Sequence, residues 1–142
     1  MRVIELACTV ATVAVVTALC TGSLHAGDLA NPGESITVMM RESLLDDAGR
    51  EGVVARVALA PGHSDAVHRH AAHVFVYVLE GTVDMQVAGG RLLRLKAGDT
   101  FYENPDDVHT ISRNASDSEW ATLLVFFVKN RDAPLVLPVP AG

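Results

Sequence analysis

Short apolar segments recur along the chain beyond residue 35, and turn residues separate them. The clearest one, residues 74–79, is apolar at every position, which is typical of a strand buried on both faces or lying between a barrel interior and a partner surface. Beyond residue 26 the sequence has no convincing helical period, so it predicts eight to ten short strands in an all-β sandwich or barrel. The segments expected as strands are 36–45, 53–60, 74–79, 82–88, 91–96, 100–103, 108–112 and 120–129.

Proline and glycine mark the turns between these segments. Pro61-Gly62 ends the segment that precedes it. Gly89-Gly90 joins residues 82–88 and 91–96 into a predicted hairpin, because glycine readily adopts the positive φ of tight hairpin turns. Residues 134–139 are expected to form an extended tail that is limited by its prolines.

The first 26 residues differ from the rest of the chain. Arg2 is followed by an apolar run over residues 7–19 and by small or polar residues up to Ala26. This arrangement predicts a signal peptide over residues 1–26, and therefore a periplasmic or secreted protein, with an uncleaved amino-terminal anchor as the alternative. Residues 27–35 are expected to form a turn-rich linker, and residues 36–142 a single β-barrel domain.

Composition narrows the classes of partner and chemistry. Both cysteines, Cys8 and Cys20, lie in the leader, so the mature domain would have neither a disulfide nor a thiolate site. Asp+Glu number 17 against 11 Lys+Arg, a formal net charge of -6. The chain has no basic stripe, and nucleic acid is excluded as a partner because phosphate contacts need clustered Lys and Arg. No membrane partner is expected once the leader is cleaved.

Three histidines form the candidate site. Alternate side chains of a strand share a face, so His68 and His70 point to the same side and can share one metal ion. His109, on a later segment, can bring a third imidazole and leave coordination positions open for a substrate. His25 in the leader and His63 after Pro61-Gly62 are expected to be structural or surface residues, because neither has a partner at a ligand spacing.

The spacing of these residues resembles that of the cupin superfamily. The first cupin motif is matched by Gly62, five residues, His68-Arg69-His70, three residues, Val74, six residues and Gly81. The second motif is matched by Gly98-Asp99-Thr100-Phe101-Tyr102, then Pro105, His109 and Asn114. This resemblance covers essentially the whole mature chain. It implies a single-domain jelly-roll barrel of six to eight strands, with the motif histidines inside, and commonly a homodimer.

One departure from the motif concerns the metal ligands. Cupins with a full metal set usually have a glutamate where this chain has Val74, and a valine cannot ligate a metal. His73 could substitute only if the preceding loop turned it inward, because strand alternation places it on the face opposite Val74. Val74, Tyr77 and Tyr102 are candidates to line the cavity.

The three histidines alone form a neutral ligand set for a divalent transition metal, with zinc, iron, copper, nickel and manganese all open and manganese the least suited. Such a set keeps the full charge of the ion, which favours anionic substrates and acidifies bound water.

Two functions follow from this site. The first is a metal-dependent enzyme that acts on a small organic ligand, as an oxygenase or an isomerase of the kinds found among single-domain cupins. No second motif selects the reaction or the catalytic residues. The alternative is a non-catalytic barrel that binds a metal or a small molecule as a sensor or carrier, which an apolar cavity with few polar groups would suit.

Overall fold

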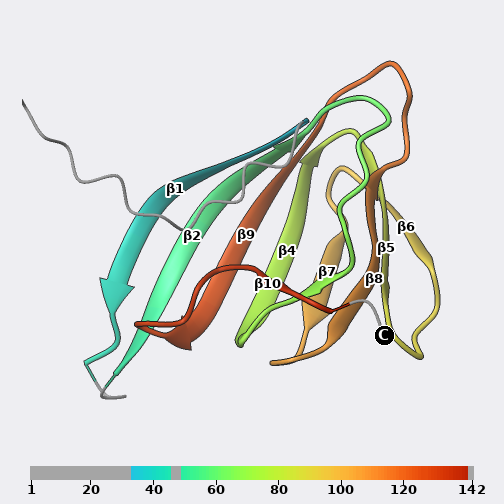
Figure 1. The fold of residues 1–142 in the computed structure, drawn as a ribbon. Helices are drawn as coiled ribbons and strands as arrows, with labels where there is room; N and C mark the ends of the chain where they lie inside the picture. Colours follow the sequence, from blue (N-terminus) through green and yellow to red (C-terminus); the bar gives the residue numbers. More distant parts are fainter. Residues whose placement is uncertain (1–32, 46–48, 141–142) are drawn as a thin grey trace, which may run out of the picture.

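The computed structural model describes residues 33–45 and 49–140, and these residues form ten β-strands joined by turns (Figure 1). This part of the chain contains no α-helix, which confirms the all-β prediction. It accordingly contains no helix long and apolar enough to cross a membrane. The predicted signal peptide lies outside the described residues. The strands are β1 (Glu34–Ser43), β2 (Arg50–Leu59), β3 (His68–Arg69), β4 (Ala72–Glu80), β5 (Thr82–Val87), β6 (Leu93–Lys96), β7 (Thr100–Glu103), β8 (Val108–Asn114), β9 (Ala121–Asn130) and β10 (Leu137–Pro138).

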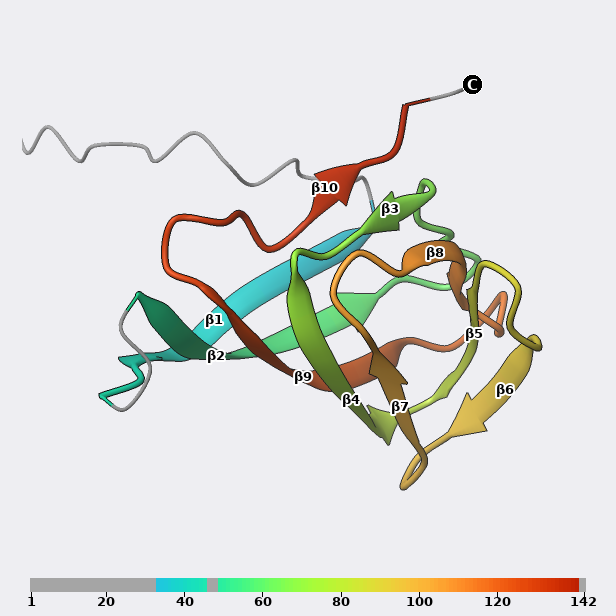
Figure 2. The same cartoon turned by 90° about the horizontal axis from the view of Figure 1, so that it is seen from below.

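The strands form two five-stranded antiparallel sheets that face each other (Figure 2). One sheet has the order β1-β2-β9-β4-β7, and the other has the order β10-β3-β8-β5-β6. The chain passes repeatedly from one sheet to the other, as at Gly81, the single residue between β4 and β5. Two facing antiparallel sheets that exchange strands in this way are a jelly-roll barrel, as expected.

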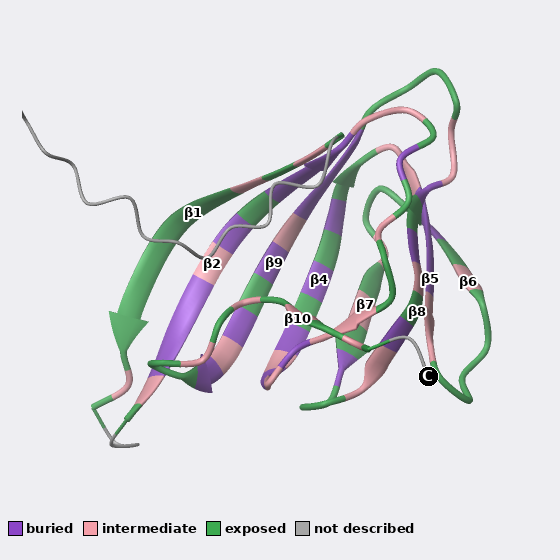
Figure 3. Ribbon diagram, viewed as in Figure 1, coloured by how far each residue is buried: buried purple, intermediate pink, exposed green. Residues whose placement is uncertain are grey.

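The core lies between the sheets and is built by strand alternation. Along β4 and β9 buried positions alternate with more exposed ones, so that each strand turns one apolar face inward (Figure 3). Burying each such aliphatic side chain stabilises the fold by about 1.5–3 kcal/mol. Four strands supply most of the buried apolar side chains of the core: Val53, Ala55, Val57 and Leu59 in β2, Val74, Val76 and Val78 in β4, Val83 and Met85 in β5, and Leu123, Val125 and Phe127 in β9.

The segment 74–79 is buried on one face only. Of the two alternatives that the sequence left open, burial on both faces within the chain is therefore wrong. Its valines point into the core, whereas Phe75, Tyr77 and Leu79 are 48%, 44% and 40% exposed. Every second side chain therefore lies on the outer face of the first sheet. In the described part of the chain no further layer covers that face, so its apolar side chains meet solvent.

Turn residues act as the sequence predicts. The hairpin between β5 and β6 forms, with Thr82 opposite Lys96 at its open end. Gly81 has a φ of 77°, and a Cβ atom there would lie 2.6 Å from the backbone oxygen of Trp120, so this motif position requires glycine. Asp106, which follows Pro105 of the second motif, takes a φ of 67°, a conformation that aspartate tolerates better than most residues.

Both ends of the described chain lie against the barrel. β1 begins at Glu34, two residues before the expected strand at 36–45, and pairs with β2 along its length. β10 pairs with β3 of the same chain, with Leu137 opposite Arg69 and Pro138 opposite His68. The proline-limited tail thus lies beside β3, the strand that carries His68.

Candidate metal centre

The three predicted histidines come together at one end of the second sheet. His68 lies in β3, His70 follows that strand directly, and His109 lies in β8 as the Cα partner of His68. The imidazole of His68 is 5.0 Å from that of His70 and 5.1 Å from that of His109, measured between ring centroids. One ring nitrogen from each histidine lies within 4.8 Å of the other two. This separation suits three ligands of a single ion.

Backbone carbonyls orient two of these rings. Nδ1 of His68 donates a hydrogen bond of 2.8 Å to the oxygen of Ala66, and Nδ1 of His70 donates to the oxygen of Leu135 in the tail. A carbonyl can only accept, so in each neutral ring the proton is on Nδ1 and the lone pair is on Nε2. Metal-binding histidines are commonly held in this way, with one nitrogen bonded to the protein and the other directed at the ion.

Three buried polar atoms in the centre have no hydrogen-bond partner among the described residues: Nδ1 and Nε2 of His109, and Oε2 of Glu103. His109 is 3% exposed and Glu103 is 2% exposed, so solvent does not replace the missing partners. Buried polar atoms are nearly always paired, and leaving one unpaired costs about 1–3 kcal/mol. Imidazole and carboxylate are also ligands that divalent transition metals prefer, so the residues present fit a metal ion.

Glu103 is the member of this centre that the sequence analysis missed. It ends β7, where it is the Cα partner of Val74 in β4, the position at which the cupin motif usually has its glutamate. Its Oε2 atom lies 3.8 Å from Nε2 of His70 and 3.5 Å from Nδ1 of His109. The sequence offered one signal for Glu103 as a site residue, namely an acidic residue at the end of a short strand in the second motif. The sequence does not show that this side chain points inward, because its direction depends on the pairing of β7 with β4.

Burial shifts the protonation of the centre. It lowers the pKa of His70 to about 4, an effect that the Leu135 hydrogen bond partly opposes. It also lowers the pKa of His109 to about 3, and the neighbouring histidines add to the shift. Burial, together with the negative charge of Asp107, raises the pKa of Glu103 to about 7. At neutral pH, therefore, His70 and His109 are neutral imidazoles, the form that binds metals.

A small cavity of about 50 Å³ adjoins the histidines. Besides aliphatic side chains it is lined by three carboxyl groups, those of Glu34, Asp65 and Glu103. Acidic side chains therefore lie beside the three imidazoles that the sequence predicts as ligands. The sequence analysis did not identify these acids, because Glu34 lies outside the two motifs and Asp65 is one of the five unspecified residues between Gly62 and His68. Val74 lines the cavity, as expected.

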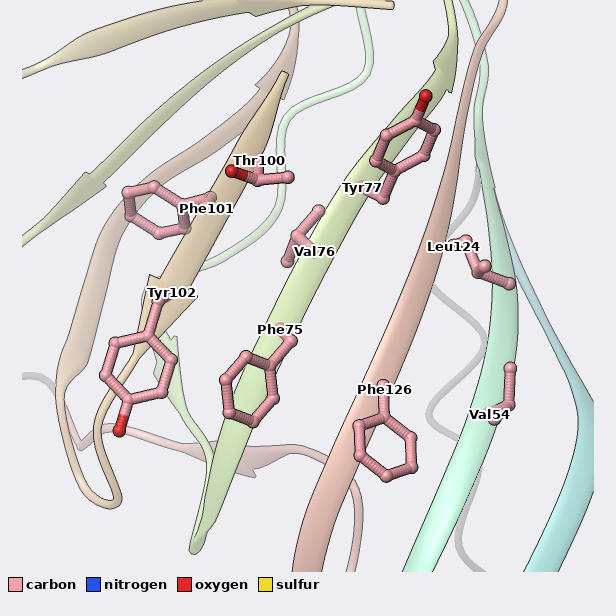
Figure 4. A pocket seen from close by; sticks show the side chains of 9 residues that line it. All are labelled: Val54, Phe75, Val76, Tyr77, Thr100, Phe101, Tyr102, Leu124 and Phe126. Carbon is pink, nitrogen blue, oxygen red and sulfur yellow. The ribbon is translucent and has the colours of Figure 1, made fainter. Parts of the chain in front are cut away.

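The other predicted residues lie on the outer face of the first sheet. Tyr77 and Tyr102, 44% and 43% exposed, do not line the histidine cavity but a shallow hollow on that face, together with Phe75 and Phe126 (Figure 4). His73 hydrogen bonds through Nδ1 to the Tyr102 hydroxyl at 2.8 Å. Strand alternation turns all three away from Val74, so His73 does not join the three-histidine cluster.

His63, expected to be structural, belongs to a hydrogen-bonded group at the cavity mouth. Its Nε2 atom lies 2.7 Å from Oδ1 of Asp65, whose Oδ2 atom accepts a 2.6 Å hydrogen bond from the Ser112 hydroxyl. Burial, reinforced by the charge of Asp65, raises the pKa of neighbouring Glu34 to about 7. His63 and Ser112 thus fix Asp65 beside the histidines.

Comparison with known proteins agrees with this architecture. The family model described as "Cupin domain" matches residues 55–127, just over half of the chain and a region that contains all three histidines and Glu103. A search of curated proteins found no match.

Several solved structures share the fold. The polyketide cyclase RemF from Streptomyces resistomycificus is 20% identical, with a TM-score of 0.57 over 78% of this chain and 73% of that one. An uncharacterized conserved protein with a double-stranded β-helix domain from Klebsiella pneumoniae is 23% identical, with a TM-score of 0.58 over 80% and 91%. The DMSP lyase DddQ from Ruegeria pomeroyi is 22% identical, with a TM-score of 0.56 over 64% of this chain and 45% of that one. This chain therefore corresponds to less than half of the lyase, and these identities show a common fold alone.

Proposed function

This chain belongs to the cupin family, and from that premise we propose that it binds one divalent transition metal ion through His68, His70 and His109, together with a small organic ligand next to the ion. Imidazole ligands suit zinc, iron, copper and nickel better than manganese. As part of the same proposal the protein is exported by the leader predicted at residues 1–26 and acts as a homodimer.

The observation that carries the proposal is the unpaired buried ring of His109. Both of its nitrogens lack a hydrogen-bond partner among the described residues, although the ring is 3% exposed and within 5.1 Å of His68. A purely structural histidine in a core would be hydrogen bonded. A cation would bind the one lone pair of the neutral His109 ring, and the backbone-held rings of His68 and His70 direct their lone pairs to the same place.

A divalent ion bound there would supply Lewis acidity, polarising a carbonyl or lowering the pKa of a bound water. The chain itself supplies the surroundings. Val74, Val76 and Phe127 line the cavity with apolar surface, which limits water. Asp65, held by His63 and Ser112, places a hydrogen-bond acceptor near the ion for orienting a ligand.

Two observations support different forms of this function. A polyketide cyclase and a DMSP lyase share the fold, so this fold can carry enzymes, and the enzyme form of our proposal is a metal-dependent oxygenase or isomerase. The cavity volume of about 50 Å³ favours the alternative, a non-catalytic metal-binding or sensor barrel, because pockets for drug-sized ligands run from about 300 to 1,000 Å³. Any organic ligand that enters without opening the barrel is therefore small.

Elemental analysis of the purified full chain tests metal binding. We expect close to one metal ion per chain in the wild type and none in the double variant His68→Ala, His70→Ala, with the barrel still folded by circular dichroism. His73→Ala is the matched control, because this histidine lies on the outer face and bonds to Tyr102. Absence of metal from the wild type, even after reconstitution with each candidate metal, would refute the proposal.

The metal-loaded protein then separates the two forms of the function. Oxygen consumption or product formation with a panel of small phenols and keto acids, abolished in the double variant, would identify an enzyme. Binding of a panel compound without turnover would identify a sensor or carrier.

A further inference from the structure

We propose that Glu103 is a fourth protein ligand of the metal ion and replaces, from the neighbouring strand, the glutamate that the first cupin motif lacks. The inference rests on the proposed function, because it requires a metal at the three histidines. It changes the expected site from three neutral imidazoles to three imidazoles and one carboxylate.

The strand register places the carboxylate where the motif position would place it. Glu103 and Val74 are directly opposite each other in the antiparallel pair of β7 and β4. Opposite residues of such a pair project from the same face, with Cβ atoms about 4.5–5.5 Å apart. Val74 is 1% exposed and Glu103 is 2% exposed, so both side chains face the interior. A carboxylate lost from β4 is thus present one strand away.

The contacts of Glu103 are those of a ligand. Its Oε2 atom is 3.8 Å from Nε2 of His70 and 3.5 Å from Nδ1 of His109. With bonds of about 2.1 Å, two ligand atoms of a tetrahedral ion lie about 3.4 Å apart. His70 donates through Nδ1 to Leu135, so its Nε2 lone pair is directed at Oε2 of Glu103. A cation between these two atoms would bind both of them.

The other buried acids of the described chain show what a structural carboxylate looks like in this protein. Glu51, 3% exposed, lies 2.7 Å from Nζ of Lys129 and also pairs with Arg41. Asp84, 1% exposed, accepts hydrogen bonds from Arg94 and Arg113. Each has cationic partners, whereas Oε2 of Glu103 has no hydrogen bond from any described residue. Glu103 has imidazole nitrogens nearby and no cationic side chain. A metal ion would therefore be the cation that pairs with its carboxylate.

Metal titration of the apo full chain tests this assignment. Co²⁺ and Zn²⁺ affinities are measured by competition with a chromophoric chelator, and Co²⁺ absorption reports the coordination. We expect Glu103→Gln to weaken both affinities by roughly tenfold or more and to change the Co²⁺ spectrum, because an amide is a poorer ligand than a carboxylate. Glu80→Gln, which removes the same charge at an exposed position of β4, should stay within about twofold of the wild type.

A second variant moves the carboxylate instead of removing it. In Val74→Glu, Glu103→Val the acid returns to the motif position, and we expect affinity to recover to within about threefold of the wild type. This double variant decides the matter if Glu103→Gln fails to fold, as checked by circular dichroism. Failure of the folded double variant to bind metal would then overturn the assignment.

The outcomes separate this inference from the proposed function. If Glu103→Gln binds metal as tightly as the wild type while His109→Ala does not bind, Glu103 is not a ligand and the three-histidine site stands. If the wild type itself binds neither metal, the proposed function fails, and the inference fails with it.

Discussion

Asp84 in β5 is buried between arginines on the two neighbouring strands. Arg94 in β6 and Arg113 in β8 are its Cα partners in the two ladders. Nε of Arg94 donates to Oδ1 at 2.8 Å, and Nη2 of Arg113 donates to Oδ2 at 2.7 Å. The pKa of Asp84 is lowered from 3.8 to about 2, chiefly by the hydrogen bond from Arg94 and also by that from Arg113, although burial opposes the shift. One side chain thus links three strands of the second sheet.

We expect Asp84→Asn to lower the free energy of unfolding at pH 7 by about 1–2 kcal/mol, a value that allows for solvent screening of the half-exposed arginines. The folded pKa lies below the unfolded one, so the ionised carboxylate stabilises the fold above about pH 4 and loses this effect as the pH falls through 2. Urea titrations at pH 7, 4 and 2.5 should therefore show the difference between wild type and variant shrinking.

Asp117→Asn at an exposed turn position is the control and should show no such trend. A difference between wild type and Asp84→Asn that stays constant from pH 7 to pH 2.5 would contradict the linkage of Asp84 to the arginines.

Among the secondary-structure elements, β2 and β9 are joined near one end of their ladder by a buried ion pair. Glu51 and Lys129 are Cα partners, and Nζ of Lys129 lies 2.7 Å from the Glu51 carboxylate. The same ammonium group donates to the backbone oxygens of Asn130, Arg131 and Ala133. Lys129 therefore fixes the turn that leads from β9 into the tail, and this tail carries the Leu135 carbonyl that orients His70.

Replacing this lysine should be costly. We expect Lys129→Met to reduce the free energy of unfolding by about 3 kcal/mol, because it leaves Glu51 buried with one cationic partner fewer and the turn carbonyls unpaired. The double variant Glu51→Gln, Lys129→Met should recover part of the loss. Chemical denaturation of the three proteins measures both effects. A Lys129→Met variant as stable as the wild type would show that the pair does not stabilise the turn.

Strand alternation explains which parts of the site could be predicted. It placed His68 and His70 on one face, and their rings are 5.0 Å apart. It also disfavoured His73 as a ligand, and His73 lies on the outer face with Tyr102. Tyr77 was expected at the cavity because a segment that is apolar at every position gives no sign of which face is inside.

Glu103 could not be predicted in the same way. Its role depends on the β4–β7 register, which pairs it with Val74, and no local pattern sets that register. The fold itself was predictable because turn residues and apolar segments mark each strand separately. The pairing of segments far apart in the chain needed the structure.

At the scale of the whole molecule, the outer face of the first sheet carries a group of apolar side chains. The ring of Phe75 in β4 contacts the rings of Tyr102 in β7 and Phe126 in β9, and all three side chains are exposed. Contiguous exposed apolar surface on a sheet commonly marks an interface. A two-fold axis would place this face against itself, which fits the homodimer that we propose.

We expect the wild type to have twice the mass of the chain by light scattering after size-exclusion chromatography. Phe75→Glu should convert it to a monomer, because the charge would be buried in the interface, while the fold remains intact since this side chain is outside the core. Leu92→Glu changes an equally exposed apolar residue between β5 and β6 and should leave the dimer unchanged. A monomeric wild type, or a dimeric Phe75→Glu variant, would place the interface elsewhere or exclude it.

The pairing of β2 with β9 has a consequence for the order of events in folding. Arg50 pairs with Asn130, eighty residues further along the chain, so the first sheet forms only after a long loop has closed, at an entropic cost of about 4 kcal/mol. His68 and His109 also meet across a long loop, through a ladder of two residue pairs. A topology of such distant pairings folds slowly, in milliseconds to seconds. The histidines come together only when these distant segments pair, so the rate of barrel closure should set when a newly made chain can bind the metal ion that we propose.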